Sequence, residues 1–206
     1  MPDDPRIWSK VEELRERFPC LRSDKLPLDL IIFVDLDLRL DLIPDDGLSR
    51  EFGADAAIKS DFTGIYVDGE TFDMIDSAPE WRLNRLRFSL AHEVGHLFLH
   101  REVFEQADIR DIDHYLAWLN EHGGRKYQLE REANEFAGRL LVPVEILRGC
   151  FDLMQPIFDT TFGRHAWIND DALRTKAAER LAPRFGVHWK TIATRFDREG
   201  IWPSPY

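Results

Sequence analysis

The stretch LAHEVGHLFLH, residues 90–100, places two histidines four positions apart, with a glutamate directly after the first. Residues four apart stack on one face of a helix, so His92 and His96 can reach the same metal ion. Glu93 is rotated by about 100° from His92, which puts it beside the ion, where a base can take a proton from water. An HExxH match arises by accident in about one chain in a hundred of this size. The alternative is an amphipathic helix with coincidental histidines.

A catalytic zinc site needs a third protein ligand, and the predicted helix over residues 126–143 offers three carboxylates. Its apolar stripe consists of Leu129, Ala133, Phe136, Ala137, Leu140 and Leu141. Glu130 lies about 60° from the middle of this stripe, Glu132 about 100° away on the other side, and Glu135 nearly opposite. This placement favours Glu130 as the ligand over Glu132. Asn134, one turn after Glu130, could orient a ligating histidine.

The roles of further residues near the predicted site stay open. His100 shares the face of His92 and His96, so it could be a fourth ligand, a contact to the transition state, or a histidine satisfied at the helix end. Peptide hydrolysis also needs a group that stabilises the oxyanion. The candidates for that group are Tyr115, Tyr127, His114 and His122.

The composition is that of a soluble globular domain, since 206 residues include 44% hydrophobic and 32% charged residues. The net charge of -11 argues against a surface that lies wholly on nucleic acid or on an anionic membrane. The start MPDDPRIWSK lacks an apolar core, and the early run LIIFV is too short to span a bilayer. Two cysteines without a CxxC motif fit a reducing compartment. We therefore expect a cytoplasmic protein that does not contact membranes.

Periodicity predicts strands first and helices later, which indicates an α+β domain. Helices are expected over residues 7–18, 83–100 and 126–143 and in the tail from Asp170, where Pro183 and Gly186 would interrupt them. A strand is expected over residues 28–44, where apolar and polar residues alternate. A hairpin over residues 64–75 would turn at Asp68-Gly69, and Gly123-Gly124 would stop a helix. The strand at residues 65–67 could pair with an extended peptide substrate if it is an edge strand.

The tail RLAPRFGVHWKTIATRF has a spacing that suits a helix-turn-helix unit, given by Ala182, Gly186 and Ile192. It is locally basic, through Arg174, Lys176, Arg180, Arg184, Lys190, Arg195 and Arg198. Contact with DNA is one interpretation. We favour a packed helical pair that completes the domain, and the patch could also receive the acidic surface of a partner.

The segments RLRFSLAHEVGHLFLH (85–100) and LEREANEFAGRLLVP (129–143) together resemble the ImmA/IrrE family of zinc metallopeptidases. The family pattern joins an HExxH helix to a helix of the form E-x-x-A-N-x-F-A-x-x-L-L-x-P, and the resemblance covers about residues 60–145. It implies a zincin-like metallopeptidase fold with a small N-terminal sheet, an HExxH helix, a Glu-ligand helix and a C-terminal helical element. It also implies that His92, His96 and Glu130 bind one Zn²⁺ per chain, while Glu93 acts on water.

We accordingly expect a single domain over residues 1–206, with a catalytic core at 60–145 and a C-terminal element at 170–206. An insertion at 101–125 departs from the family pattern and could form a lid, a plug or a substrate-binding element. The resemblance implies a zinc endopeptidase whose substrate is a helix-turn-helix repressor, cleaved in a stress or mobile-element response. The alternative is a DNA- or protein-binding regulatory module, antitoxin-like, with a structural or inactive metal site. The oligomeric state stays open.

Overall fold

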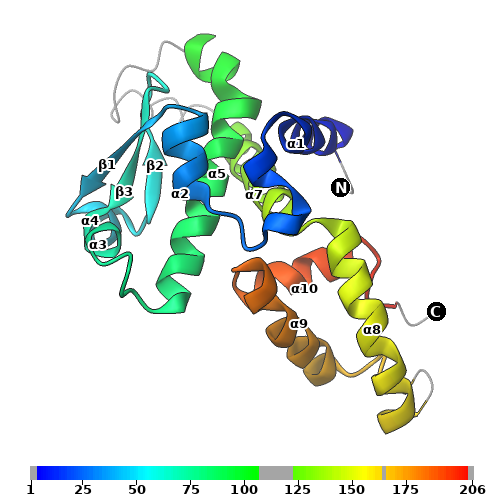
Figure 1. Cartoon of the computed structure of the whole chain (residues 1–206). Coiled ribbons are helices and arrows are strands. Elements are labelled where there is room, and N and C mark those ends of the chain that lie inside the picture. The colour runs from blue at the N-terminus through cyan, green and yellow to red at the C-terminus, as the bar shows by residue number, and fades with distance from the viewer. Residues whose placement is uncertain (1–3, 107–122, 164–165, 204–206) are drawn as a thin grey trace.

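The computed structural model describes residues 4–106, 123–163 and 166–203. A small sheet lies on one side of the long helix α5, and a helical group from the C-terminal part of the chain lies on the other (Figure 1). The elements are α1 (Pro5–Arg17), α2 (Leu30–Ile32), β1 (Asp41–Asp45), α3 (Leu48–Phe52), β2 (Ala56–Ile58), β3 (Gly64–Asp68), α4 (Gly69–Asp73), α5 (Glu80–Gln106), α7 (Gly123–Leu141), α8 (Val144–Phe162), α9 (Asp171–Phe185) and α10 (Trp189–Arg198). The expected α+β class is confirmed. Within the described ranges, no helix is both long enough and apolar enough to cross a bilayer.

The sheet described here has three strands in the order β1-β3-β2, with β1 parallel and β2 antiparallel to β3. The hairpin predicted at Asp68-Gly69 is wrong, because the chain enters α4 there. The Asp68 carboxylate accepts the Thr71 backbone N–H at 3.1 Å and so caps α4. The antiparallel pair is β2 with β3 instead. Since β3 is paired on both sides, residues 65–67 are not an edge, and the edge strand on this side is β2.

The strand predicted over residues 28–44 is also wrong for most of its length. Asp29 accepts the N–H groups of Ile31 and Ile32, both at 3.1 Å, and starts a helical segment that continues as a π-helical turn at Phe33–Asp37. Leu30, Phe33 and Val34 are buried at helical spacing. Only Asp41–Asp45 forms a strand. The capping carboxylate and the burial of one helical face outweigh the local alternation.

The longer helices follow their apolar periodicity. The helix expected at residues 7–18 is α1, and α5 extends the expected helix 83–100 at both ends. Every residue of the apolar stripe predicted for α7 is buried. Gly123-Gly124 lies at the start of α7 and not at the end of a helix, which corrects that prediction.

Helices α5 and α7 cross at Gly95. A Cβ atom built on Gly95 would lie 3.2 Å from Ala133 Cα and 3.2 Å from the Phe136 ring. This separation is closer than two side chains usually allow, so the glycine and the small alanine set the distance between the helices.

The C-terminal helices are attached to α7 by a buried ion cluster. Glu135 is 8% exposed, and its carboxylate pairs with Arg139 at 2.5 Å, with Arg195 at 3.0 Å and with Arg198. Glu135 is opposite the apolar stripe of α7, as expected, but α10 covers that face, so the side chain is buried. The turn at Gly186, with φ of 59°, separates α9 from α10, while Pro183 lies inside α9 and does not interrupt it.

We predict that Gly95→Val lowers the free energy of unfolding by about 1–3 kcal/mol, because the added methyl groups force the two helices apart. The melting temperature should fall by about 2–4 °C per kcal/mol for a chain of this size. Gly149→Ala is the matched control, since Gly149 is exposed in α8 with open space around it, and alanine should stabilise the helix there. Equal stability of Gly95→Val and wild type would contradict the close crossing.

We predict that Glu135→Gln lowers the free energy of unfolding by about 3–5 kcal/mol, because it leaves Arg139 and Arg195 buried with less counter-charge. Urea unfolding followed by circular dichroism measures the change. Glu13→Gln removes the partner of Lys10 in an exposed pair and should cost less than about 1 kcal/mol. Similar losses in the two variants would show that the cluster does not attach α10.

Candidate metal centre

Three donor side chains meet where α5 crosses α7. His92 Nε2 lies 3.0 Å from His96 Nε2 and 3.2 Å from a Glu130 carboxylate oxygen, while His96 Nε2 lies 3.5 Å from the other. Zinc with bonds of about 2.0–2.1 Å in tetrahedral geometry would separate its donor atoms by about 3.3 Å. The two imidazole nitrogens and one Glu130 oxygen lie within 4.8 Å of one another, with a different carboxylate oxygen nearest to each histidine, so small side-chain movements would bring the three donors onto one zinc ion.

The outer nitrogen of His92 is held by α7. His92 Nδ1 lies 3.2 Å from Asn134 Oδ1, and since an amide oxygen can only accept, Nδ1 carries the proton. The lone pair of His92 therefore remains on Nε2, the atom that faces His96 and Glu130. Asn134 fixes the tautomer that a metal ligand needs.

His96 is held in the same way through His100. His100 Nε2 lies 3.1 Å from Glu132 Oε2, and His100 Nδ1 lies 3.0 Å from His96 Nδ1. A carboxylate only accepts, so neutral His100 donates from Nε2 and accepts at Nδ1. His96 then donates from Nδ1 and keeps its lone pair on Nε2. Both His100 and Glu132 thus lie behind His96, away from the donor atoms, and His100 is not placed as a fourth ligand.

Burial favours the neutral form of His96 and His100, whereas the carboxylates around His92 favour its charged form. Burial lowers the pKa of His96 to about 3, with a further contribution from the charge of His92. Burial likewise lowers the pKa of His100, against the opposing hydrogen bond to Glu132. For His92, burial also acts to lower the pKa, but the hydrogen bond to Glu130 and the charge of Glu93 outweigh it. A neutral imidazole is the form that binds metal, so His96 needs no deprotonation at neutral pH.

Glu93 lies beside the three donors, between α5 and the edge strand β2. Its carboxylate accepts the backbone N–H of Ile58 at 2.9 Å. Burial raises the pKa of Glu93 to about 7, although the nearby His92 and the Ile58 N–H act in the opposite direction. A carboxyl group with a pKa near neutrality can both take and return a proton.

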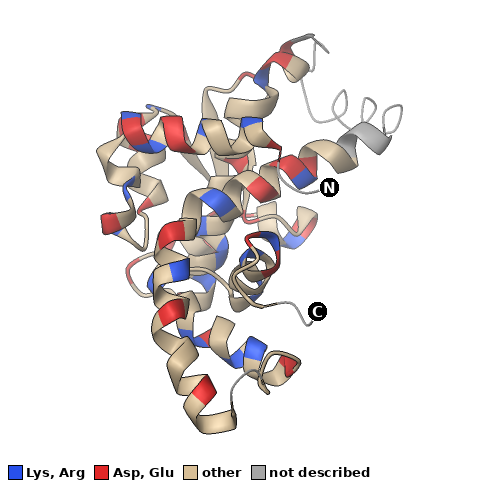
Figure 2. Cartoon of the chain, turned by 90° about the vertical axis from the view of Figure 1, so that its right-hand side faces the viewer, with Lys and Arg blue, Asp and Glu red and all other residues tan. Residues whose placement is uncertain are grey.

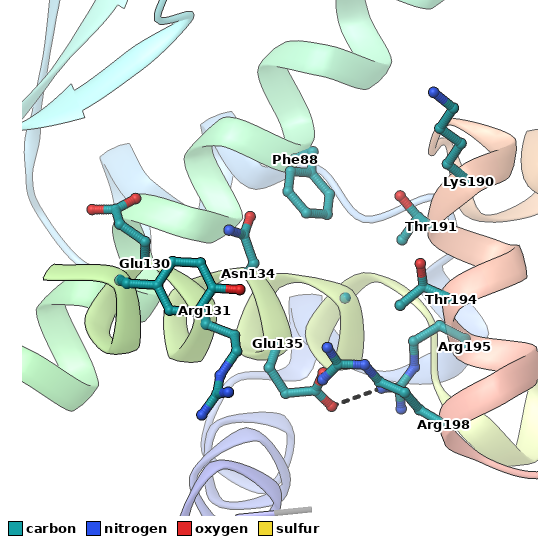
Figure 3. A pocket seen from close by; sticks show the side chains of 12 residues that line it. Phe88, Glu130, Arg131, Asn134, Glu135, Lys190, Thr191, Thr194, Arg195 and Arg198 are labelled. Carbon is teal, nitrogen blue, oxygen red and sulfur yellow. Dashed lines mark hydrogen bonds and ion pairs between the residues drawn. The ribbon is translucent and has the colours of Figure 1, made fainter. Parts of the chain in front are cut away.

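A cavity of about 410 Å³ begins at Glu130 and extends along α7 to α10 (Figure 3). Phe88 of α5 and Thr191 and Thr194 of α10 line it, and sequence reasoning missed all three. The spacing of Phe88, Thr191 and Thr194 does not distinguish them from other helix positions, because the sequence does not show that α10 packs on α7.

The other candidate residues are less informative. Tyr127 is 72% exposed and lines the same cavity, so the structure places it near Glu130. Tyr115, His114 and His122 lie outside the described residues, as does most of the insertion at 101–125.

Three of the seven basic residues of the tail are paired within the fold, while Lys176, Arg180, Arg184 and Lys190 are exposed. Arg195 and Arg198 pair with Glu135, and Arg174 pairs with Asp197 at 2.5 Å. Figure 2 shows basic and acidic residues intermingled along the helices on this side of the molecule. The helix-turn-helix spacing at Gly186 is present, yet these contacts favour the interpretation of a packed helical pair.

The family model of peptidase M78, described as an IrrE N-terminal-like domain, matches residues 78–197, which is more than half of the chain and includes α9 and nearly all of α10. No curated protein and no solved structure matches the chain. The family match and the His-His-Glu cluster point to the same class of protein, and the chain belongs to the peptidase M78 family of metallopeptidases.

Proposed function

We propose that the protein is a zinc-dependent endopeptidase with His92, His96 and Glu130 as ligands of one zinc ion. The observation that carries the proposal is the convergence of three donor atoms from two helices, with both imidazoles held in the ligating tautomer. When bound, zinc would polarise the scissile carbonyl and make water a stronger nucleophile.

The residues of the chain account for the proton transfers. Glu93 takes a proton from the attacking water and returns it to the leaving amine. The Ile58 N–H holds the Glu93 carboxylate in place from β2. Because β2 is an edge strand of the described sheet, those of its outward backbone groups that Glu93 does not use can also pair with an extended substrate next to the site.

For the substrate, we propose a helix-turn-helix transcriptional repressor, whose cleavage would relieve repression in a stress or mobile-element response. The support is the family resemblance, together with the cavity beside Glu130, which could take a segment of a protein chain. A cytoplasmic location belongs to the same proposal, because such repressors act on DNA.

We predict that the wild-type protein, purified without chelator, contains about one zinc per chain and that Glu130→Gln loses it. Glu132→Gln should keep the stoichiometry and weaken zinc affinity by about 10–100-fold, because Glu132 acts only through His100 and His96. Elemental analysis and competition with a chromophoric chelator measure both effects. If Glu132→Gln lost zinc and Glu130→Gln kept it, Glu132 would be the metal ligand and Glu130 would not.

We predict that Glu93→Gln retains zinc while turnover falls by at least about 10²–10⁴-fold, because the amide cannot accept a proton. A peptide library prepared from a digested proteome, read by mass spectrometry for new termini, tests this without a known substrate. Glu105→Gln on the exposed end of α5 is a control that should cleave like wild type. Cleavage by Glu93→Gln at the wild-type rate would remove Glu93 from the mechanism.

A further inference from the structure

The cavity that Glu130 and Asn134 line on the metal side lies between α5, α7 and the C-terminal helix α10. Its α7 side runs from Tyr127 to Gly138, and Phe88 of α5 faces the α10 residues Thr191 and Thr194 across it (Figure 3). Gly138 has no side chain to fill this space. A Cβ atom built on it would lie 3.6 Å from the Arg195 side chain. A peptide whose scissile bond lies at the metal would extend into this space.

The uncharged residues among those that line the cavity suit an extended peptide. Thr191 and Thr194 lie one turn apart on α10, and Asn134 lines the cavity with an amide N–H group that the bond from its oxygen to His92 does not use. An extended chain presents unpaired N–H and C=O groups at intervals of about 3.3 Å per residue. Hydroxyl and amide groups can satisfy them, while half-buried Phe88 offers an apolar contact for a side chain.

The charges of the lining are unbalanced. Four basic and two acidic residues line the cavity, in a chain whose net charge is -11. Of the carboxylates, Glu130 faces the histidines and Glu135 pairs with Arg195 and Arg198. The remaining cations are Arg131 and Lys190, both exposed, and neither pairs with a carboxylate among the residues that the structure describes.

We propose that this cavity holds the segment of the protein substrate on one side of the scissile bond, and that Arg131 and Lys190 select an acidic side chain in that segment. The inference rests on the proposed peptidase function, and it names a substrate feature that this function leaves open. It assigns α10 to substrate binding and gives a reason for the buried ion cluster that fixes α10 on α7.

The test measures binding and not cleavage. The probes are fluorescein-labelled hexaglutamate, hexaglutamine and hexalysine peptides, and the protein is the full chain with Glu93→Gln, loaded with zinc, so that no probe is consumed. Fluorescence anisotropy at low salt should show that hexaglutamate binds more tightly than the other two. Adding Arg131→Glu and Lys190→Glu should weaken hexaglutamate binding by about tenfold or more, and added salt should reduce the difference.

The matched control is Lys176→Glu with Arg180→Glu, which makes the same change of charge at exposed positions of α9 outside the cavity. It should leave hexaglutamate binding within about twofold of the parent. Equal weakening by both double variants would overturn the proposal, as would hexaglutamate binding no better than hexaglutamine. Tight binding of a labelled 12-base-pair DNA duplex that is lost on Arg131→Glu and Lys190→Glu, without hexaglutamate binding, would overturn it in favour of nucleic acid.

These outcomes are separable from failure of the proposed function. Zinc content and cleavage of the peptide library are measured on protein with Glu93 intact, whereas the anisotropy experiment needs neither turnover nor a native substrate. A chain that binds hexaglutamate through Arg131 and Lys190 but cleaves nothing would contradict the peptidase proposal, and would leave the cavity as a site for acidic peptides with no scissile bond beside it.

Discussion

The close contact of Gly95 with Ala133 is the constraint on which the metal centre depends. His92 and His96 stand three residues before and one residue after Gly95, and Glu130 and Asn134 stand in the same relation to Ala133. Positions related in this way share a helix face. When the two backbones touch at the small residues, the four polar side chains on either side of the contact are brought together. A larger residue at the crossing would separate the donors even if every ligand were kept.

Burial at this crossing also sets the chemistry of the site. The same desolvation that lowers the pKa of His96 to about 3 raises that of Glu93 to about 7, since both shifts disfavour the charged form. Hydrogen bonds then direct the imidazoles: Asn134 orients His92, and Glu132 acts on His96 through His100. An ordinary helix with coincidental histidines would not need this set of partners, which favours a metal centre over a chance HExxH match.

The C-terminal helices are joined to this centre by charge as well as by apolar packing. Glu135 binds arginines of α10 from the face of α7 opposite its apolar stripe, and Arg87 of α5 donates to the carbonyl oxygens of Leu28 at 3.0 Å and Gly186 at 2.7 Å. The turn between α9 and α10 is thereby tied to the catalytic helix. Arg174, Arg195 and Arg198 are neutralised within the fold, and exposed Lys190 at the start of α10 lines the cavity.

The sequence by itself determined the two helices, their apolar faces and the ranking of Glu130 over Glu132 as the carboxylate nearest His92 and His96, because helical periodicity fixes which side chains share a face. The predictions of a strand at residues 28–44 and of a hairpin at residues 64–75 were wrong. Asp29 and Asp68 cap helices there, whereas the alternation of apolar residues and the Asp-Gly turn signal had indicated strands. Only the tertiary structure decided that Glu135 is buried, that His100 supports His96, and that Thr191 and Thr194 face the metal-side cavity. Each of these depends on which element packs against a given helix face, and periodicity carries no information about the partner.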